Sequence, residues 1–231
     1  MKRSKMNIMM FMLVGMIFMA SYFKYATKAV ETIGLSTASK VIIIDPGHGG
    51  FDPGKQGIQG ENEKDINLKI ALKLRDYLEQ SGAIVVMTRT TDNDTDGLDG
   101  VKYKNKDMQE RKKIADGGDI LISIHQNSFT QPSVKGAQTF YNKKSDKGKL
   151  LAELLQESIK QYVDTSNRRE PKANSDYYVL KATSIPAVIV ECGFLTNPEE
   201  EKKLNSDAYQ EDIAWGIYHG IVKYFEKVEG Q

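Results

Sequence analysis

The chain alternates between short runs of branched apolar residues and longer segments in which apolar residues recur every three or four positions. The short runs predict strands, at 41–45, 83–89, 119–125, 136–142, 177–181 and 187–191. The longer segments predict helices, at about 65–80, 107–116, 145–163 and 206–226. Because strands and helices alternate, we predict an α/β fold with a single domain, in which helices cover both faces of a mainly parallel, mixed sheet of about six strands. Ser145 and Ser206 are expected to cap the last two helices.

The first residues do not follow this pattern. A basic start (MKRSK) precedes an apolar run at 8–20, which is the arrangement of an export signal or a short membrane anchor. Cleavage after Ala20 and cleavage after Ala29 both remain open. We therefore expect residues 1–39 to form a signal or anchor segment with a linker, and residues 40–231 to form one folded domain that works after export across the cytoplasmic membrane.

The composition and one incomplete motif narrow the range of partners. Lys and Arg number 32 against 31 Asp and Glu, for a formal net charge of +1, so nothing suggests nucleic acid as a partner. Cys192 is the only cysteine, which excludes an intramolecular disulfide, and we interpret it as a small buried residue beside a strand. The segment 91–100 begins like a calcium loop, but Tyr103 stands where such a loop needs a bidentate glutamate. We interpret it as an acidic turn.

Residues able to carry chemistry fall at the ends of three predicted strands. His48 follows the first strand in a glycine-rich loop (DPGHGG), His125 ends the third and Glu191 ends the last. Because ligands bind beyond the carboxyl ends of the strands in open α/β sheets, we expect these side chains at one edge. Glu61 and Glu63, before the first helix, can both reach that edge. Two imidazoles and one carboxylate make a three-ligand catalytic zinc site, and a further acid is left for proton transfer.

Two other residues near these positions receive structural interpretations. Asp45 adjoins the glycine-rich loop and could be a second metal ligand, but we favour a role in holding the loop. His219 lies on the last predicted helix, and we interpret it as part of the helix surface or of the edge of the core.

Four motifs in a fixed order carry a resemblance to a known family. They are IDPGHGGFDPG, EKDINL, LISIHQN and PAVIVECGFLTNPEE, within a match that runs from about residue 41 to 226. Together they resemble the zinc-dependent N-acetylmuramoyl-L-alanine amidases of the amidase_3 family. The resemblance implies that His48, Glu63 and His125 bind one zinc ion, which selects Glu63 over Glu61, and that Glu191 is the catalytic acid and base. It also implies the substrate, peptidoglycan, cut between the lactyl group of N-acetylmuramic acid and the L-alanine of the stem peptide.

The resemblance also suggests a biological setting. A short exported chain without wall-binding repeats looks most like the sporulation or germination amidases of spore-forming bacteria, which act in making the spore cortex. We therefore expect residues 40–231 to be a zinc amidase domain that acts in the cell wall or developing cortex, with membrane contact only through the N-terminal segment. Residues 90–118 leave little room for the inhibitory helix that some members carry. A separate protein that places or activates the enzyme is therefore a hypothesis.

Two rival functions share part of this pattern. One is a zinc carboxypeptidase that cuts within the stem peptide. The other is an inactive wall-binding protein that keeps zinc for structure. Glu191 argues against the second, because a purely structural zinc site closes with a fourth protein ligand and needs no spare base.

Overall fold

The computed structural model describes residues 15, 16, 19, 36–93 and 104–230. Contacts between residues divide the chain into two compact units, Met1–Ser36 and Thr37–Gln231. Most of the apolar run at 8–20 and most of the acidic turn at 91–100 lie outside the described residues. Among the residues that are described, no helix has both the length and the apolar character needed to cross a membrane.

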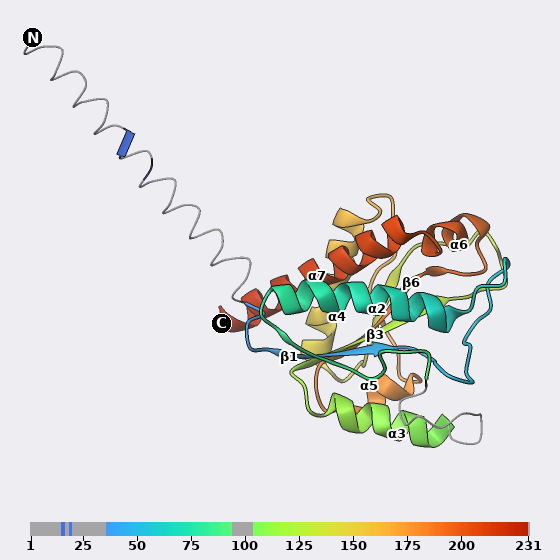
Figure 1. Ribbon diagram of the computed structural model, residues 1–231, viewed down its shortest axis with the longest axis horizontal. Coiled ribbons are helices and arrows are strands. Elements are labelled where there is room, and N and C mark those ends of the chain that lie inside the picture. Colours follow the sequence, from blue (N-terminus) through green and yellow to red (C-terminus); the bar gives the residue numbers. More distant parts are fainter. Residues whose placement is uncertain (1–14, 17–18, 20–35, 94–103, 231) are drawn as a thin grey trace, which may run out of the picture. The chain divides into compact units, whose positions relative to one another are not determined.

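The larger unit is built on a six-stranded sheet (Figure 1). Its strands are β1 (Val41–Pro46), β2 (Ile84–Met87), β3 (Ile120–Asn127), β4 (Gln138–Tyr141), β5 (Lys172–Ala173) and β6 (Ala187–Phe194). They lie side by side in the order β2-β1-β3-β6-β4-β5. Neighbouring strands are parallel except that β4 runs antiparallel to β6. The predicted mixed, mainly parallel sheet is confirmed.

Helices cover both faces of this sheet (Figure 1). One layer consists of α2 (Glu63–Gln80), α4 (Asp146–Tyr162) and α7 (Asp207–Glu229), and we call the side it covers the three-helix face. The other layer consists of α3 (Lys104–Ala115) and α5 (Tyr178–Ala182), and it covers the two-helix face. A short helix, α6 (Pro198–Leu204), lies between β6 and α7 in the chain.

Alternation along each strand decides which layer a side chain meets. In β1, Ile42 and Ile44 belong to the core of the three-helix face, whereas Ile43 belongs to the core of the two-helix face. All three are buried, as expected for a strand covered on both sides. The parallel pairing of β1, β3 and β6 extends this alternation across the sheet. One residue of shift along a strand therefore moves a side chain from one core to the other.

Local signals in the sequence explain several helix ends and one helix contact. The hydroxyl oxygens of Ser145 and Ser206 accept backbone N–H groups at the starts of α4 and α7, as predicted. Helices α4 and α7 approach closely at Gly220, where an added Cβ would lie 2.7 Å from the Cα of Leu155. That contact depends on the missing side chain.

The prediction of a strand at 177–181 is wrong, because this segment forms α5. The side-chain oxygen of Asn174 accepts the backbone N–H groups of the two residues just before the helix, a turn that directs the chain into a helical conformation. The sixth strand is instead β5, two residues inside the segment 165–175, where the sequence pattern predicts neither a strand nor a helix.

The strand predicted at 83–89 exists, but β2 is one of the two edge strands of the sheet and is not buried throughout. Ile84 is 53% exposed and Val86 is 37% exposed. Both pair with β1 residues that face the two-helix side, where the smaller helical layer leaves the edge of the sheet uncovered.

Candidate metal centre and active site

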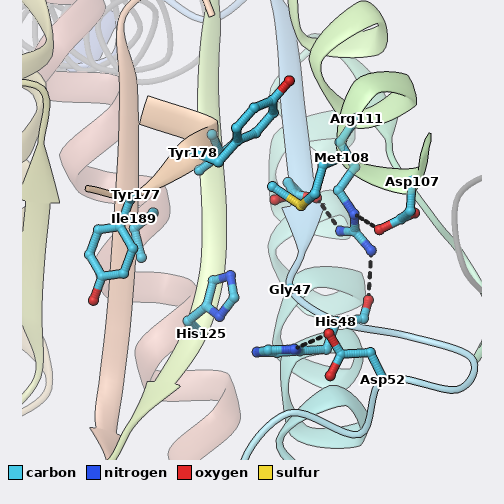
Figure 2. Close-up of a pocket in the computed structure, with 12 residues that line it drawn as sticks. Gly47, His48, Asp52, Asp107, Met108, Arg111, His125, Tyr177, Tyr178 and Ile189 are labelled. Atoms are coloured by element: carbon cyan, nitrogen blue, oxygen red, sulfur yellow. Dashed lines mark hydrogen bonds and ion pairs between the residues drawn. The ribbon is translucent and has the colours of Figure 1, made fainter. Parts of the chain in front are cut away.

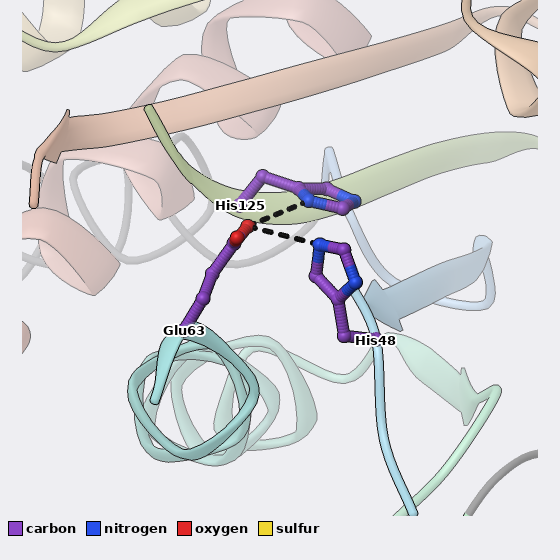
Figure 3. Close-up of side chains that lie close together, drawn as sticks. All are labelled: His48, Glu63 and His125. Carbon is purple, nitrogen blue, oxygen red and sulfur yellow. Dashed lines mark hydrogen bonds and ion pairs between the residues drawn. The ribbon is translucent and has the colours of Figure 1, made fainter. Parts of the chain in front are cut away.

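His48, Glu63 and His125 converge at the carboxyl ends of β1 and β3 and at the start of α2 (Figure 3). Oε1 of Glu63 lies 3.3 Å from Nε2 of His48 and 2.9 Å from Nδ1 of His125. One ligand atom from each residue lies within 4.8 Å of the others. Over the described ranges, this is the one group of three or more His, Cys, Asp or Glu side chains close enough to hold a metal ion. Glu61 is not part of it and pairs instead with Lys69.

The glycine-rich loop after β1 allows the two imidazoles to approach one another. His48 has a φ of +61°, in the left-handed region that residues other than glycine seldom adopt, and Gly49 and Gly50 also have positive φ. A Cβ added at Gly47 would lie only 2.2 Å from the ring of His125. The glycines therefore let the loop fold sharply and let a strand-end imidazole pack against bare backbone.

Asp45 holds this loop and is not part of the cluster. One of its carboxylate oxygens accepts a hydrogen bond from Arg111 at 2.5 Å, and the other accepts one from Ser123 at 2.6 Å. Arg111 also donates to the backbone carbonyl of His48 at 2.7 Å (Figure 2). Burial disfavours the charged carboxylate, but Arg111 and the neighbouring hydroxyls outweigh this effect and lower the pKa of Asp45 to about 2. The structure agrees with the interpretation of Asp45 as a residue that holds the loop.

Hydrogen bonds fix the charge and orientation of the cluster. Burial disfavours charge on Glu63, yet hydrogen bonds and charge interactions with the imidazoles of His125 and His48 hold its pKa well below the usual range. The backbone N–H of Gln126 donates to the same carboxylate at 3.0 Å. Burial also disfavours charge on His48, but hydrogen bonds to Asp52 and Glu63 raise the pKa of His48 to about 9. A carboxylate oxygen of Asp52 lies 3.1 Å from Nδ1 of His48 and orients the ring. The other ring nitrogen, Nε2, is therefore directed at Glu63.

Glu191 lies beside the cluster on the next strand. The register of β3 and β6 places it directly opposite His125, so both side chains face the two-helix side. Glu191 is 6% exposed, and its Oε2 is buried without a hydrogen-bond partner among the described residues. Burial is the main effect on this group and raises its pKa to about 7, although the nearby imidazole of His125 opposes the shift. A buried carboxyl with one free oxygen and a pKa near neutrality is suited to accept and return a proton.

A pocket opens from the cluster toward the two-helix layer (Figure 2). Met108 of α3 and Tyr178 of α5 contribute to its walls, together with Tyr177 just before α5. Tyr178 is 42% exposed, so the pocket is open to solvent at this side. The mixture of aromatic, thioether and charged groups suits a ligand that has both apolar and polar parts.

Comparison with known proteins identifies the family. A family model described as N-acetylmuramoyl-L-alanine amidase, Amidase_3, matches residues 42–223. The chain belongs to this family. The germination-specific N-acetylmuramoyl-L-alanine amidase of Bacillus subtilis is 34% identical to it over 232 residues, which cover 96% of each chain. The probable cell wall amidase LytH of Staphylococcus epidermidis is 34% identical over 80% of this chain and 58% of that relative.

A solved structure agrees with the family assignment. The CwlD amidase from Clostridioides difficile, determined in complex with the GerS lipoprotein, is 43% identical to this chain. The two structures match with a TM-score of 0.77 over 82% of this chain and 100% of the other. The resemblance expected from the four motifs is therefore confirmed, and the chain is an enzyme of the amidase family.

Tyr177 is a residue of this amidase that the sequence pattern did not single out. Its hydroxyl donates a hydrogen bond to Oε1 of Glu191 at 3.3 Å. Its ring packs edge-on against Phe140, with 5.6 Å between ring centres. Burial and the nearby carboxylate raise the pKa of Tyr177 to about 12, so the phenol keeps its proton. The signal that could have revealed it is the asparagine three positions earlier, which favours a turn over a continuous strand.

The remaining candidates lie away from the cluster of His48, Glu63 and His125. Cys192 is buried on the three-helix face, and burial raises the pKa of its thiol, which disfavours the reactive thiolate. His219 lies on α7, where its ring stacks on Tyr162. Both agree with their structural interpretations.

Proposed function

We propose that this chain is a zinc-dependent peptidoglycan amidase that hydrolyses the amide between the lactyl group of N-acetylmuramic acid and the L-alanine of the stem peptide. The observation that carries this proposal is the convergence of three ligand side chains beside a buried carboxylate that has a free oxygen. A structural zinc site has four protein ligands, whereas a catalytic one has three and leaves a position for water. Three ligands with a spare base favour catalysis over a purely structural or wall-binding role.

The donor set fits zinc. Two imidazoles and one carboxylate are usual ligands of catalytic zinc, whereas magnesium and calcium prefer oxygen ligands alone. Asp52 beside the other ring nitrogen of His48 is the kind of partner that orients a metal-binding histidine. We therefore assign His48, Glu63 and His125 as the ligands of one zinc ion. When bound, the ion would polarise the substrate carbonyl and lower the pKa of a water molecule to about 7.

Glu191 is proposed to perform both proton transfers. It takes a proton from the attacking water and then delivers that proton to the amide nitrogen, which is a poor leaving group as an anion. Tyr177 holds one oxygen of the carboxylate, and the other has no hydrogen-bond partner among the described residues, so the second oxygen is the one available to the water. The pKa of about 7 that burial produces lets the same group accept and release a proton near neutral pH.

The test is to identify the products released from purified peptidoglycan by mass spectrometry. The amidase is expected to free whole stem peptides that begin with L-alanine. A carboxypeptidase would instead release single carboxyl-terminal amino acids, and a wall-binding protein would bind without releasing any peptide. The zinc content of the purified chain should be close to one ion per molecule, and His48→Ala should reduce it. Release of single amino acids alone would refute the proposal.

We further propose that the enzyme acts in spore cortex maturation, where it would start formation of muramic lactam, and in germination. The germination-specific relative supports this setting, since it matches over nearly the whole of both chains. In the same proposal, residues 1–39 direct export or anchor the chain, and residues 40–231 form the catalytic domain. Spores that lack the enzyme should have cortex without muramic lactam, and the wild-type gene should restore it. Normal lactam content in such spores would contradict this role.

A protein partner that places or activates the enzyme is also proposed. The similar CwlD amidase was solved in complex with the GerS lipoprotein, which supports the presence of a protein partner here. Purification of the tagged chain from sporulating cells should recover this partner, and its addition should increase hydrolysis of cortex peptidoglycan. Full activity of the pure enzyme, with no protein recovered, would refute the proposal.

A further inference from the structure

His125 of β3 and Glu191 of β6 lie side by side on the two-helix face, and a third polar residue, on β4, extends this row. Gln138 pairs directly with Glu191 in the antiparallel ladder of β4 and β6, so its side chain lies on the same face. Nε2 of Gln138 donates to the backbone carbonyl of Glu170 at 2.7 Å. This hydrogen bond joins the active-site edge to the loop at 164–170.

A cavity of about 330 Å³ lies where that loop meets the residues before β4. Three cationic residues line it, namely Lys135, Arg168 and Arg169, together with one acidic residue, Asp164. Nε of Arg169 donates to the carbonyl of Lys135 at 3.0 Å. Within the part of the chain that the structure describes, none of the three cations forms an ion pair with a carboxylate. One carboxylate among three cations leaves the lining of the cavity with a net positive charge, which favours a bound anion.

The loop that carries these cations is held in place. Asn167 is buried, and its side-chain amide donates to the carbonyl of Ala137 at 2.8 Å while its oxygen accepts the backbone N–H of Arg169 at 2.9 Å. The guanidinium of Arg169 lies over the ring of Phe194 at 5.0 Å. Only Nε of this guanidinium is used in a hydrogen bond within the described chain, which leaves its two terminal nitrogens for a ligand. A guanidinium with two free nitrogens matches the geometry of a carboxylate.

The separation from the reacting bond suits the stem peptide. Lys135 and Gly136 precede Gln138 by two or three residues, and β4 lies beside β6, so at roughly 3.3 Å per residue and roughly 4.8 Å between strands the cavity begins about 8 to 11 Å from the Cα atom of Glu191. In an extended stem, the residue after L-alanine carries its own carboxyl group at roughly 7 Å from the bond that is cut. The glycan side of that bond is uncharged once the lactyl group is in amide linkage. An anionic group of the bound substrate that reaches this cavity therefore comes from the peptide side of the bond.

We infer that this cavity binds the free carboxylate of the acidic residue that follows L-alanine in the stem peptide. The inference rests on the proposed function and names the part of the substrate that the site selects. The contact is made in the bound substrate and in the transition state alike, so it lowers KM and leaves kcat nearly unchanged.

The test compares two soluble muropeptides that differ only in whether this carboxyl group is free or amidated. The double variant Lys135→Gln, Arg168→Gln removes two exposed cations and leaves Arg169 in place over the ring of Phe194. We expect its KM for the free acid to rise about tenfold with little change in kcat, and its KM for the amide to stay as in the wild type. The control is Lys143→Gln, Lys144→Gln, which removes the same charge from exposed residues just after the opposite end of β4.

The outcomes separate this inference from the proposed function. An equal effect of the double variant on both substrates, an equal effect of the control, or no effect at all would overturn the carboxylate site while the amidase activity stands. Failure of the wild-type enzyme to release stems beginning with L-alanine from either substrate would overturn the proposed function and this inference together.

Discussion

The two faces of the central sheet are formed by alternate residues of the same strands, yet they differ in what they bury. Toward the carboxyl ends of the strands, the three-helix face remains apolar, with Ile44 in β1 and Cys192 in β6. At the same level, the two-helix face carries Asp45, His125 and Glu191. His125 and Glu191, which can act in catalysis, are therefore immediate neighbours of residues that belong to the core of the three-helix face.

This difference shows how the fold tolerates an unfavourable site. A buried carboxyl with a free oxygen costs free energy, as does a histidine in the left-handed region. Glu191, on the two-helix face, is such a buried carboxyl, and His48, beside that face, is such a histidine. The larger apolar core of the three-helix face offsets these costs, because the same strands contribute side chains to both faces. Substitutions at neighbouring positions of one strand should therefore separate activity from stability.

The largest effect is expected from Glu191→Gln. The amide keeps the size of the side chain but cannot accept the proton of water, so peptide release should fall by about a thousandfold or more while the zinc content is unchanged. The neighbouring Cys192→Ala should keep full activity and lose about 1 kcal/mol of stability through the cavity that it leaves. Mass spectrometry of released stems and urea unfolding measure the two quantities. Activity of Glu191→Gln within tenfold of the wild type would contradict the assigned base.

A large loss of stability is expected from Asp45→Asn. The substitution leaves the buried guanidinium of Arg111 without its main counter-charge, which costs about 3 kcal/mol or more, but zinc should still bind. Because the folded-state pKa of Asp45, about 2, lies below its ordinary value of 3.8, its contribution is fully present above about pH 4 and is lost as the pH falls toward 2. Ile44→Val, one residue away, should cost about 1 kcal/mol at every pH.

Urea unfolding at pH 7 and at pH 2.5 measures this difference. The gap in stability between Asp45→Asn and the wild type should narrow in acid, whereas the gap for Ile44→Val should not. Loss of zinc from Asp45→Asn that is still folded would show that Asp45 is a ligand after all.

Much of this fold could be predicted because its signals are local. Runs of branched apolar residues located the parallel strands, and serines located the starts of α4 and α7. Helix α6 was missed although its signals are also local, since Asn197 caps it and Pro198 opens it. Its short length leaves too few apolar positions to show a helical period. The segment 177–181 was misassigned because its β-branched and aromatic residues favour a strand, and a turn just before them overrides that preference.

The part of the site that could be predicted is the part formed by residues at the ends of strands. His48, His125 and Glu191 each follow or end a buried strand, and parallel strands bring such residues to one edge. Spacing could not separate Glu61 from Glu63, because the choice depends on where α2 begins and how it packs against β3. Tyr177 could not be found in this way at all. Its contact with Glu191 joins residues of different elements and depends on the turn at Asn174.

A moderate loss of stability without loss of activity is expected from Gly220→Ala. The new methyl group would meet the backbone of α4 at Leu155, so the two helices must move apart at a cost of about 2 kcal/mol. Gly216→Ala is the matched control on the same helix, because the nearest atom there, at 3.1 Å, belongs to the side chain of Val163, which can adjust. Urea unfolding compares the two variants, and both should keep the kcat of the wild type. A fall in kcat of Gly220→Ala while it remains folded would show that the two faces are not independent.

The smallest effect is expected from Tyr177→Phe, which removes one hydroxyl from the two-helix face. Loss of the hydrogen bond to Oε1 lets the carboxylate of Glu191 rotate, so kcat should fall about tenfold while KM and zinc content change little. The same hydrogen bond lowers the pKa of Glu191, so its removal should raise that pKa and move the acid limb of the kcat profile to higher pH. Tyr162→Phe, which changes an exposed tyrosine at the end of α4, should alter neither. A kcat loss without a shift of the acid limb would mean that Tyr177 supports the pocket only through packing, and the hydrogen bond to the base would then have no part in positioning it.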